Sequence, residues 1–202
     1  MKNHNIYQNI MRTLLIFISG AILFLAGCES QQFEFVGTIN TEKTYVVDNS
    51  GTFNESAQVS LVEILDSLDL PEDAIIGDVN FESLAIYVEL LDGNAATSVS
   101  VNGSVDIDGD DLNLFNNFVV SAADAGSWIS LTGLANDGVA AVKEKLQQYV
   151  TGTSATPFTV WTSGSSSPSA GSRVHANITI QIKCTVKYYQ EADVPWFIHG
   201  TE

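Results

Sequence analysis

The chain has 202 residues, with 24 acidic side chains against eight lysines and arginines, and a formal net charge of −16 at pH 7. Nucleic-acid binding depends on cationic contacts with phosphate, so this charge argues strongly against that class of protein. It also argues against attachment to anionic lipid through charge alone. We interpret the acidity as a source of solubility outside the cytoplasm rather than as a site for cationic partners.

The first 27 residues have the pattern of an export signal. Lys2, His4 and Arg12 precede an uncharged run over 13–27, which matches a charged n-region followed by a short apolar h-region. The run is shorter than the ~20 apolar residues that a membrane-spanning helix needs. Met11 is an alternative start, and it would shorten the signal without altering its end.

The tetrapeptide Leu25-Ala26-Gly27-Cys28 closes the apolar run and resembles the lipobox of bacterial lipoproteins. The resemblance implies that signal peptidase II recognises Leu25, Ala26 and Gly27 and cleaves before Cys28. It further implies that the Cys28 sulfur carries a diacylglycerol and that the new amino group receives an acyl chain such as palmitate. In Gram-negative lipoproteins, an aspartate directly after the lipidated cysteine favours retention in the inner membrane. This chain has Glu29 at that position, so the resemblance implies the outer membrane. The alternative is an uncleaved signal anchor with an incidental cysteine.

Cleavage after residue 27 would leave 175 residues, enough for one domain with a substantial core. We expect residues 28–32 to form a short tether and residues 33–202 to form a single β-rich domain. Once Cys28 is lipidated, Cys184 has no partner in the chain. The domain is therefore expected to fold without a disulfide, and Cys184 is most simply a small core residue.

A first helix is predicted over 61–69, where leucine, isoleucine and valine recur at helical spacing. Ser60 and Glu63 have the spacing of a capping box, in which each side chain bonds a backbone N–H at the helix start. A strand at this place would require Glu63 on the buried face, so the helix is favoured.

A second helix is predicted over 137–150, with Lys145 among the polar residues off its apolar stripe. Asn136 is the predicted cap, and Gly152 follows in the position of a left-handed ending. The stripe consists of Val139, Val142, Leu146 and Tyr149.

Much of the remaining sequence alternates between apolar and polar residues, as strands do. Strands are predicted over 84–90 and 99–107, with 112–120 as the hairpin partner of the second. A further strand is predicted over 156–162, followed by a loop rich in serine, glycine and proline over 163–172.

The final predicted strand, 173–188, has apolar residues or tyrosine at every even position and polar residues at every odd one. This pattern indicates one buried and one solvated face. Alternating strands with two short helices predict a mainly β fold, an antiparallel β-sandwich-like domain.

The acidic segment after the strand 99–107 invites a calcium interpretation. Asp106, Asp108 and Asp110 fit the first ligand positions of an EF-hand loop, but Asp111 and Asn117 replace the glycine and the glutamate that the loop requires. A solvated hairpin turn is favoured, and the weak alternative is a surface calcium site at Asp108, Asp110 and Asp111.

The odd-numbered residues of the last strand include half of the lysines, arginines and histidines that follow the signal. These residues are Arg173, His175, Lys183 and Lys187. One hypothesis makes them a partner-binding face for an acidic protein, a polysaccharide or lipid phosphates. The other, which we favour, pairs them with acidic residues of neighbouring strands.

Three tryptophans are candidate sugar-stacking residues, although ordinary packing is favoured for each: Trp128, Trp161 and Trp196. His175 and His199 lack neighbours at zinc-ligand spacing, and neither a nucleophile-elbow motif nor a phosphate-binding glycine loop is present in the sequence. We therefore expect no cofactor and no catalytic residue.

Together these patterns predict a non-enzymatic lipoprotein of the cell envelope, anchored to the membrane by acyl chains, with a binding or structural domain. Its partner would be a protein, a glycan or a lipid, and not nucleic acid. A carrier of lipid or another apolar ligand is the first alternative and would need an elongated apolar tunnel. A glycan-acting enzyme is the second, and it would need two carboxyl groups about 5–9.5 Å apart across a cleft.

Overall fold

A computed structural model describes residues 28–68, 70–167 and 172–195, and 63% of the chain is strand. The predicted signal peptide lies outside the described residues. Within the described ranges, none of the helices has the length and apolar character needed to cross a membrane. The elements are β1 (Cys28–Ser50), β2 (Thr52–Val59), α2 (Leu61–Ser67), β3 (Ile75–Leu90), β4 (Ser98–Ile107), β5 (Asp110–Ser121), β6 (Trp128–Ser130), α3 (Asn136–Val150), β7 (Phe158–Ser167) and β8 (Arg173–Pro195).

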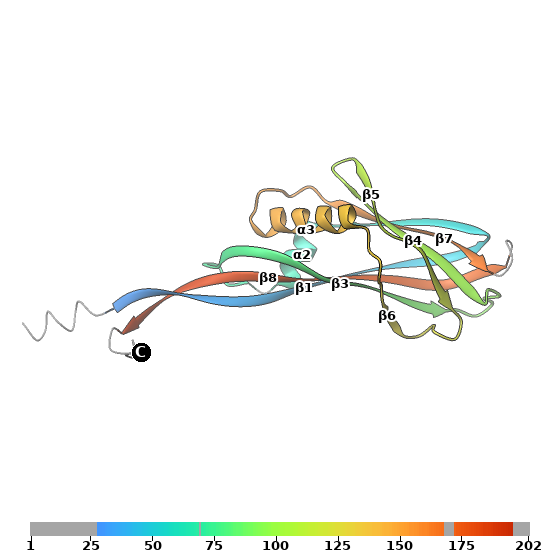
Figure 1. Ribbon diagram of the computed structural model, residues 1–202, viewed down its shortest axis with the longest axis horizontal. Coiled ribbons are helices and arrows are strands. Elements are labelled where there is room, and N and C mark those ends of the chain that lie inside the picture. Colours follow the sequence, from blue (N-terminus) through green and yellow to red (C-terminus); the bar gives the residue numbers. More distant parts are fainter. Residues whose placement is uncertain (1–27, 69, 168–171, 196–202) are drawn as a thin grey trace, which may run out of the picture. The chain divides into compact units, whose positions relative to one another are not determined.

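The main unit of the structure, residues 35–188, is a sandwich of two antiparallel four-stranded sheets. One sheet has the strand order β1-β8-β3-β6 and the other has the order β2-β7-β4-β5 (Figure 1). Helix α3 contacts β3 of the first sheet and β4 and β5 of the second. The predicted fold class, a mainly β sandwich with two short helices, is confirmed.

A second, smaller unit contains the first residues of β1 and the last residues of β8. The Ser30 hydroxyl donates to Glu191 over 3.3 Å, and the Tyr189 hydroxyl donates to Glu34 over 3.2 Å. Residues 28–32, predicted as a tether, are thus part of the extended strand β1 in the structure.

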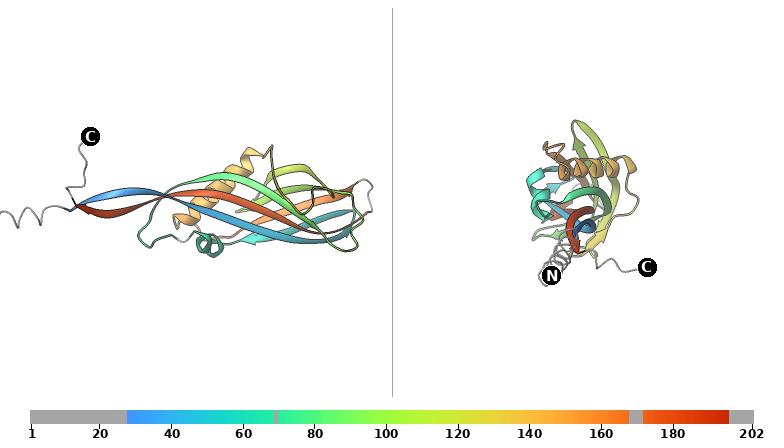
Figure 2. Two further views of the ribbon diagram at one scale, coloured as in Figure 1. Left: turned by 90° about the horizontal axis from the view of Figure 1, so that it is seen from below. Right: turned by 90° about the vertical axis from the view of Figure 1, so that its left-hand side faces the viewer.

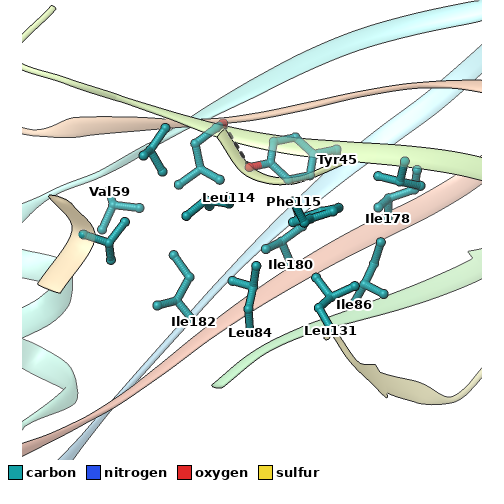
Figure 3. Packing of buried hydrophobic residues seen from close by; sticks show 14 of the residues in the cluster. Tyr45, Val59, Leu84, Ile86, Leu114, Phe115, Leu131, Ile178, Ile180 and Ile182 are labelled. Atoms are coloured by element: carbon teal, nitrogen blue, oxygen red, sulfur yellow. Dashed lines mark hydrogen bonds between the residues drawn. The ribbon is translucent and has the colours of Figure 1, made fainter. Parts of the chain in front are cut away.

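The core of the sandwich depends on the alternation of β8, which follows the predicted pattern. The even residues from Val174 to Val186 are buried, and Figure 3 shows Ile178, Ile180 and Ile182 pointing toward Leu114 and Phe115 of the opposite sheet. The two sheets are also joined by a buried hydrogen bond of 3.0 Å, which the Tyr45 hydroxyl donates to the carbonyl of Val160. Burial raises the pKa of Tyr45, so its hydroxyl remains a donor at physiological pH.

Both predicted helices are confirmed, with corrections at their starts. Ser60 caps α2 by accepting the backbone N–H of Glu63, but the Glu63 carboxylate pairs with Lys43 over 2.6 Å instead of completing the capping box. The predicted cap of α3 at Asn136 is wrong, because Ala135 occupies that position without a side-chain bond. The predicted left-handed residue after α3 is confirmed at Gly152, whose φ is +69°.

Helix α3 also protects a strand edge. β6 pairs with β3 at residues 85–87. Near the start of β3, which β6 does not reach, Gln147 of α3 accepts the N–H of Val79 over 2.8 Å and donates to the carbonyl of Gly77 over 3.0 Å. An unpaired strand edge invites association with other chains, so the glutamine takes the place of a missing strand.

The hairpin between β4 and β5 is confirmed, whereas the strand predicted over 156–162 was too short. β7 continues through the predicted serine- and glycine-rich loop as far as Ser167, because β2 and β4 pair with it on both sides. Gly164 permits this pairing, since a Cβ there would collide with the Ser100 carbonyl and the Phe53 ring. Strands β1, β2 and β6 were not predicted.

We predict that Gly164→Ala lowers the free energy of unfolding by about 2 kcal/mol or more, because the backbone of β4 cannot move away from the added methyl group without disrupting the ladder. Urea denaturation followed by circular dichroism measures this change. Ser163→Ala, at a neighbouring position that is only partly buried, is the control and is expected to change stability little. Equal stability of the two variants would contradict the close approach at Gly164.

Candidate binding face and the pocket beside α3

The candidate partner-binding residues lie on the outward side of the sheet β1-β8-β3-β6, which we call the polar face. Its members are the odd residues of β8, the even residues of β1 and the outward residues of β3, since the alternate residues of these strands fill the core. Figure 2, left, looks onto β1, β8 and β3, with α3 behind them. The face is solvated and carries most of the side-chain hydrogen bonds described below.

The four basic residues predicted to form a docking stripe do not converge on one point. Arg173 binds Asp48 of β1 through two bonds of 2.7 and 2.9 Å, and His175 Nδ1 lies 2.7 Å from the carbonyl of Asp92. Lys183 is exposed farther along β8, and Lys187 is partly buried. From Arg173 to Lys187 an extended strand covers roughly 48 Å, too far for one small ligand.

Between the basic residues, uncharged donors of β8 bind oxygens of its neighbours. Asn177 donates to Glu89 over 2.8 Å, Gln181 donates to Glu42 over 2.7 Å and Thr185 donates to Glu82 over 2.8 Å. The hydroxyls of Thr44 and Thr179 are also bonded, at 2.8 Å. The polar face is therefore ordered by cross-strand hydrogen bonds and is rich in carboxylates.

The acidic turn considered for calcium is a two-residue hairpin loop. Asp108 and Gly109 have φ values of +56° and +97°, and Asp106 accepts the N–H of Gly109 over 3.1 Å. The Asp108 carboxylate binds the ammonium group of Lys145 through distances of 2.9 and 3.1 Å. Across the described ranges, the structure groups no three acidic, histidine or cysteine side chains in a way that would hold a metal ion.

Lys145 is the unexpected residue of this region, because its side chain is only 1% exposed. Besides Asp108, its ammonium group donates to the Ser154 hydroxyl over 3.2 Å and lies 5.8 Å from the centre of the Tyr149 ring. The prediction that placed Lys145 off the buried stripe is wrong. It stands three residues after Val142 and four before Tyr149, a spacing that puts all three on one helix face.

A pocket of about 190 Å³ opens beside this lysine. Ile107, Leu112 and Ala141 supply apolar surface, and charged or amide side chains supply the remainder. The polar lining residues are Asp108, Asp110, Glu144, Lys145 and Gln148. The pocket therefore differs from the elongated apolar tunnel that a lipid carrier would need.

The other candidate residues have separate environments. Cys184 is free and buried, and burial raises the pKa of its thiol to about 12, so it is a poor nucleophile. Trp128 of β6 is 46% exposed, whereas Trp161 of β7 is partly buried. Trp196 and His199 lie outside the described residues.

In sequence, the chain matches no protein-family profile and no curated protein. Among solved structures, it is similar to a chain of turnip yellow mosaic virus, with 12% identity and a TM-score of 0.36 over 80% of this chain and 96% of that one. It is also similar to the BFDV capsid protein, with 10% identity and a TM-score of 0.33 over 79% and 98% of the two chains. A Parabacteroides distasonis protein has 11% identity and a TM-score of 0.34 over 78% and 50%. None of these three is named as an enzyme.

We predict that Asp108→Asn lowers the free energy of unfolding by about 2 kcal/mol, because it leaves the buried ammonium group of Lys145 without a negative partner. Asparagine tolerates the φ of +56° at this position, so the turn itself is preserved. The loss is smaller than the roughly 3–5 kcal/mol of a fully buried pair, since the Asp108 side chain is 55% exposed. Lys145→Met removes the buried charge and is expected to cost about 1 kcal/mol or less. In the double variant, the methionine should recover most of the loss; additive losses in denaturation experiments would contradict the pairing.

We also predict that Asp48 titrates below the usual range of an aspartate. The hydrogen bonds from Arg173, followed by its positive charge, lower the pKa of this carboxyl group. Because the folded-state pKa is depressed, the pair stabilises the fold above the unfolded-state pKa, and this contribution is lost as pH falls through the folded-state value. An NMR titration of the Asp48 side chain measures the shift. Arg173→Gln should return the pKa toward the ordinary value, while Lys183→Gln should leave it unchanged.

Proposed function

We propose that the protein is a bacterial envelope lipoprotein, held in the outer membrane by acyl chains on Cys28, that presents its β-sandwich as a non-enzymatic binding or structural domain. The observation that carries this proposal is the sequence Leu25-Ala26-Gly27-Cys28 at the end of a short uncharged run. Each buried CH₂ group of an acyl chain contributes ~0.8 kcal/mol, so two or three chains suffice for stable attachment.

The architecture is compatible with a domain that folds outside the cytoplasm. Cys184 is free and its neighbours on β8 are buried aliphatic residues, so this part of the core depends on packing rather than on a disulfide. Residues 28–202 have a formal charge of −18, from six lysines and arginines against 24 acidic residues. This charge disfavours contact with anionic headgroups, which supports an acyl anchor over an electrostatic one.

A binding or structural role is favoured over catalysis by the state of the polar groups. Most of the carboxylates described on the polar face accept bonds from neighbouring strands, and Asp108 is paired with Lys145. A cysteine acts as a nucleophile in its thiolate form, and Cys184 is buried with a raised thiol pKa. A broad surface with its hydrogen bonds already formed suits recognition of an extended partner.

The anchor is tested by replacing Cys28 with serine in the full-length chain. We expect Cys28→Ser to abolish incorporation of labelled palmitate and to remove the protein from the outer-membrane fraction, because the thiol is the only attachment point for the diacylglycerol. Cys184→Ala is the matched control, since it removes the other cysteine and should leave labelling and fractionation unchanged.

Mass spectrometry of the mature wild-type N terminus completes the test. The expected product begins at Cys28 and carries the mass of a diacylglycerol and an additional acyl chain. A native membrane form that begins at Met1 or Met11, or palmitate labelling that persists in Cys28→Ser, would refute the proposal.

A further inference from the structure

One end of the main unit carries most of its exposed apolar side chains. Of the eight large apolar residues that are exposed among the described residues of this unit, five come from the first residues of β1 in the unit, from α2 and from the first residue of β3. These five, which we call the apolar end, are Phe35, Val36, Val62, Leu65 and Ile75. Apolar side chains gathered in one region indicate a contact surface, whereas single ones are ordinary.

Contacts between β1, β8 and α2 bring these residues together. The rings of Phe35 and Tyr188 stack, with centroids 5.5 Å apart and an angle of 21° between the planes. A Cβ atom built on Gly37 of β1 would lie 3.4 Å from the Leu68 side chain at the end of α2 and 3.8 Å from the Tyr188 ring. Figure 2, left, shows α2 and the start of β3 on the same half of the unit. The exposed residues of three elements therefore belong to one region.

The side chains of the apolar end point in several directions. On α2, Ile64 faces the core, whereas Val62 and Leu65 are three residues apart on a side of the helix that the core leaves exposed. Phe35 and Val36 follow each other on a strand and project to opposite faces, yet they are 42% and 60% exposed. A protein partner or a second copy would cover one of these faces. A fluid layer of lipid headgroups can surround all of them, so lipid fits this end better.

The apolar end also lies within reach of the proposed anchor. Phe35 is seven residues after Cys28, and an extended chain spans at most ~3.6 Å per residue, so the two residues are no more than about 25 Å apart. Acyl chains on Cys28 would therefore keep the apolar end close to a membrane surface at all times.

Charge determines which kind of lipid suits this end. Asp66, Glu72 and Asp73 are exposed on the segment between Val62 and Ile75, and carboxylates are repelled by anionic headgroups. Zwitterionic headgroups carry no net charge, so they do not oppose the approach of these residues. Aliphatic and aromatic side chains bind such a layer at the boundary between headgroups and acyl chains.

We propose that the apolar end inserts its side chains into the headgroup layer of the zwitterionic membrane that holds the acyl chains of Cys28. This inference rests on the proposed anchor, which supplies the membrane at close range. For Phe35 and Val62 to reach the layer together, the segment that follows Cys28 must run along the membrane surface. The contact therefore holds the main unit in a fixed orientation, which an acyl tether alone would not do.

Spin labels on three exposed valines test this contact in the full-length acylated protein. Val36→Cys, Val62→Cys and Val46→Cys are each made together with Cys184→Ala and labelled with a nitroxide; the sulfur of acylated Cys28 is a thioether and does not react. The proteins are reconstituted into vesicles of phosphatidylethanolamine and phosphatidylcholine. EPR power saturation then compares access of oxygen, which concentrates in the bilayer, with access of a water-soluble nickel complex. We expect a several-fold higher ratio of oxygen to nickel access at positions 36 and 62 than at position 46.

Val46 is a matched control for both labelled positions. It is 64% exposed on β1, against 60% for Val36 and 66% for Val62. It is also nearer to Cys28 along the chain than Val62 is, so proximity to the anchor cannot explain a deeper label on α2.

A second substitution assigns the depth of the label to the apolar residues. Phe35→Asn should lower the ratio at position 36 several-fold, because the asparagine side chain does not partition into the headgroup–acyl boundary. Val119→Asn, at an exposed position of β5, should leave the ratio unchanged. Thermal melting followed by circular dichroism shows that each labelled variant is folded.

Vesicle flotation and label depth separate this inference from the anchor. If the acylated protein floats with the vesicles while the labels at positions 36 and 62 are as open to nickel as the label at position 46, the anchor stands and this inference is wrong. Dipolar broadening between labels of two Cys28→Ser molecules in buffer would show that a second copy covers the apolar end, which would also refute it. Protein that neither incorporates palmitate nor floats would refute the proposed function and this inference with it.

Discussion

The structure depends on the burial of one face of β8. This strand lies between β1 and β3, so it pairs on both sides while its even residues from Val174 to Val186 fill the space between the sheets. A shift of one residue in its register would place lysine, glutamine and asparagine in the core and expose the isoleucines. The same constraint determines which side chains make up the polar face, because the odd residues have nowhere else to project.

Local patterns were sufficient for the parts of the fold that carry strong periodicity. The alternation of β8, the two-residue turn at Asp108 and Gly109, and the apolar stripe of α3 are each visible within about fifteen residues of sequence. β1, β2, β6 and the second half of β7 were missed. The second half of β7 is rich in serine and glycine, which have little tendency to form strands on their own. β6 has only three residues, and β2 contains asparagine, glutamate, alanine and glutamine, which are uncommon in strands. They are extended because partners far away in sequence bond to their backbones; Phe53 of β2, for example, faces Gly164 of β7.

The same limit applies to the candidate site. The sequence placed Arg173, His175 and Lys183 on one strand face, but it could not show that Arg173 binds Asp48, 125 residues earlier. The contact of Lys145 with Asp108 also joins separate elements, a helix and a hairpin turn. A lysine in a polar helical segment is ordinarily assigned to solvent, and only the packing of α3 against β4 and β5 reveals the exception.

The pairing of cations within the domain determines the charge of its surface. Lys43, Lys143, Lys145 and Arg173 each pair with a carboxylate of the domain itself, so most of its few cations are used internally. What remains on the surface is an excess of carboxylates, which repels anionic ligands at long range and is screened beyond roughly 8–10 Å by physiological salt. An uncharged ligand pays no such penalty, and within hydrogen-bond distance the same carboxylates become strong acceptors for hydroxyl groups. The excess of carboxylates therefore repels anions at long range and leaves the approach of uncharged molecules unaffected.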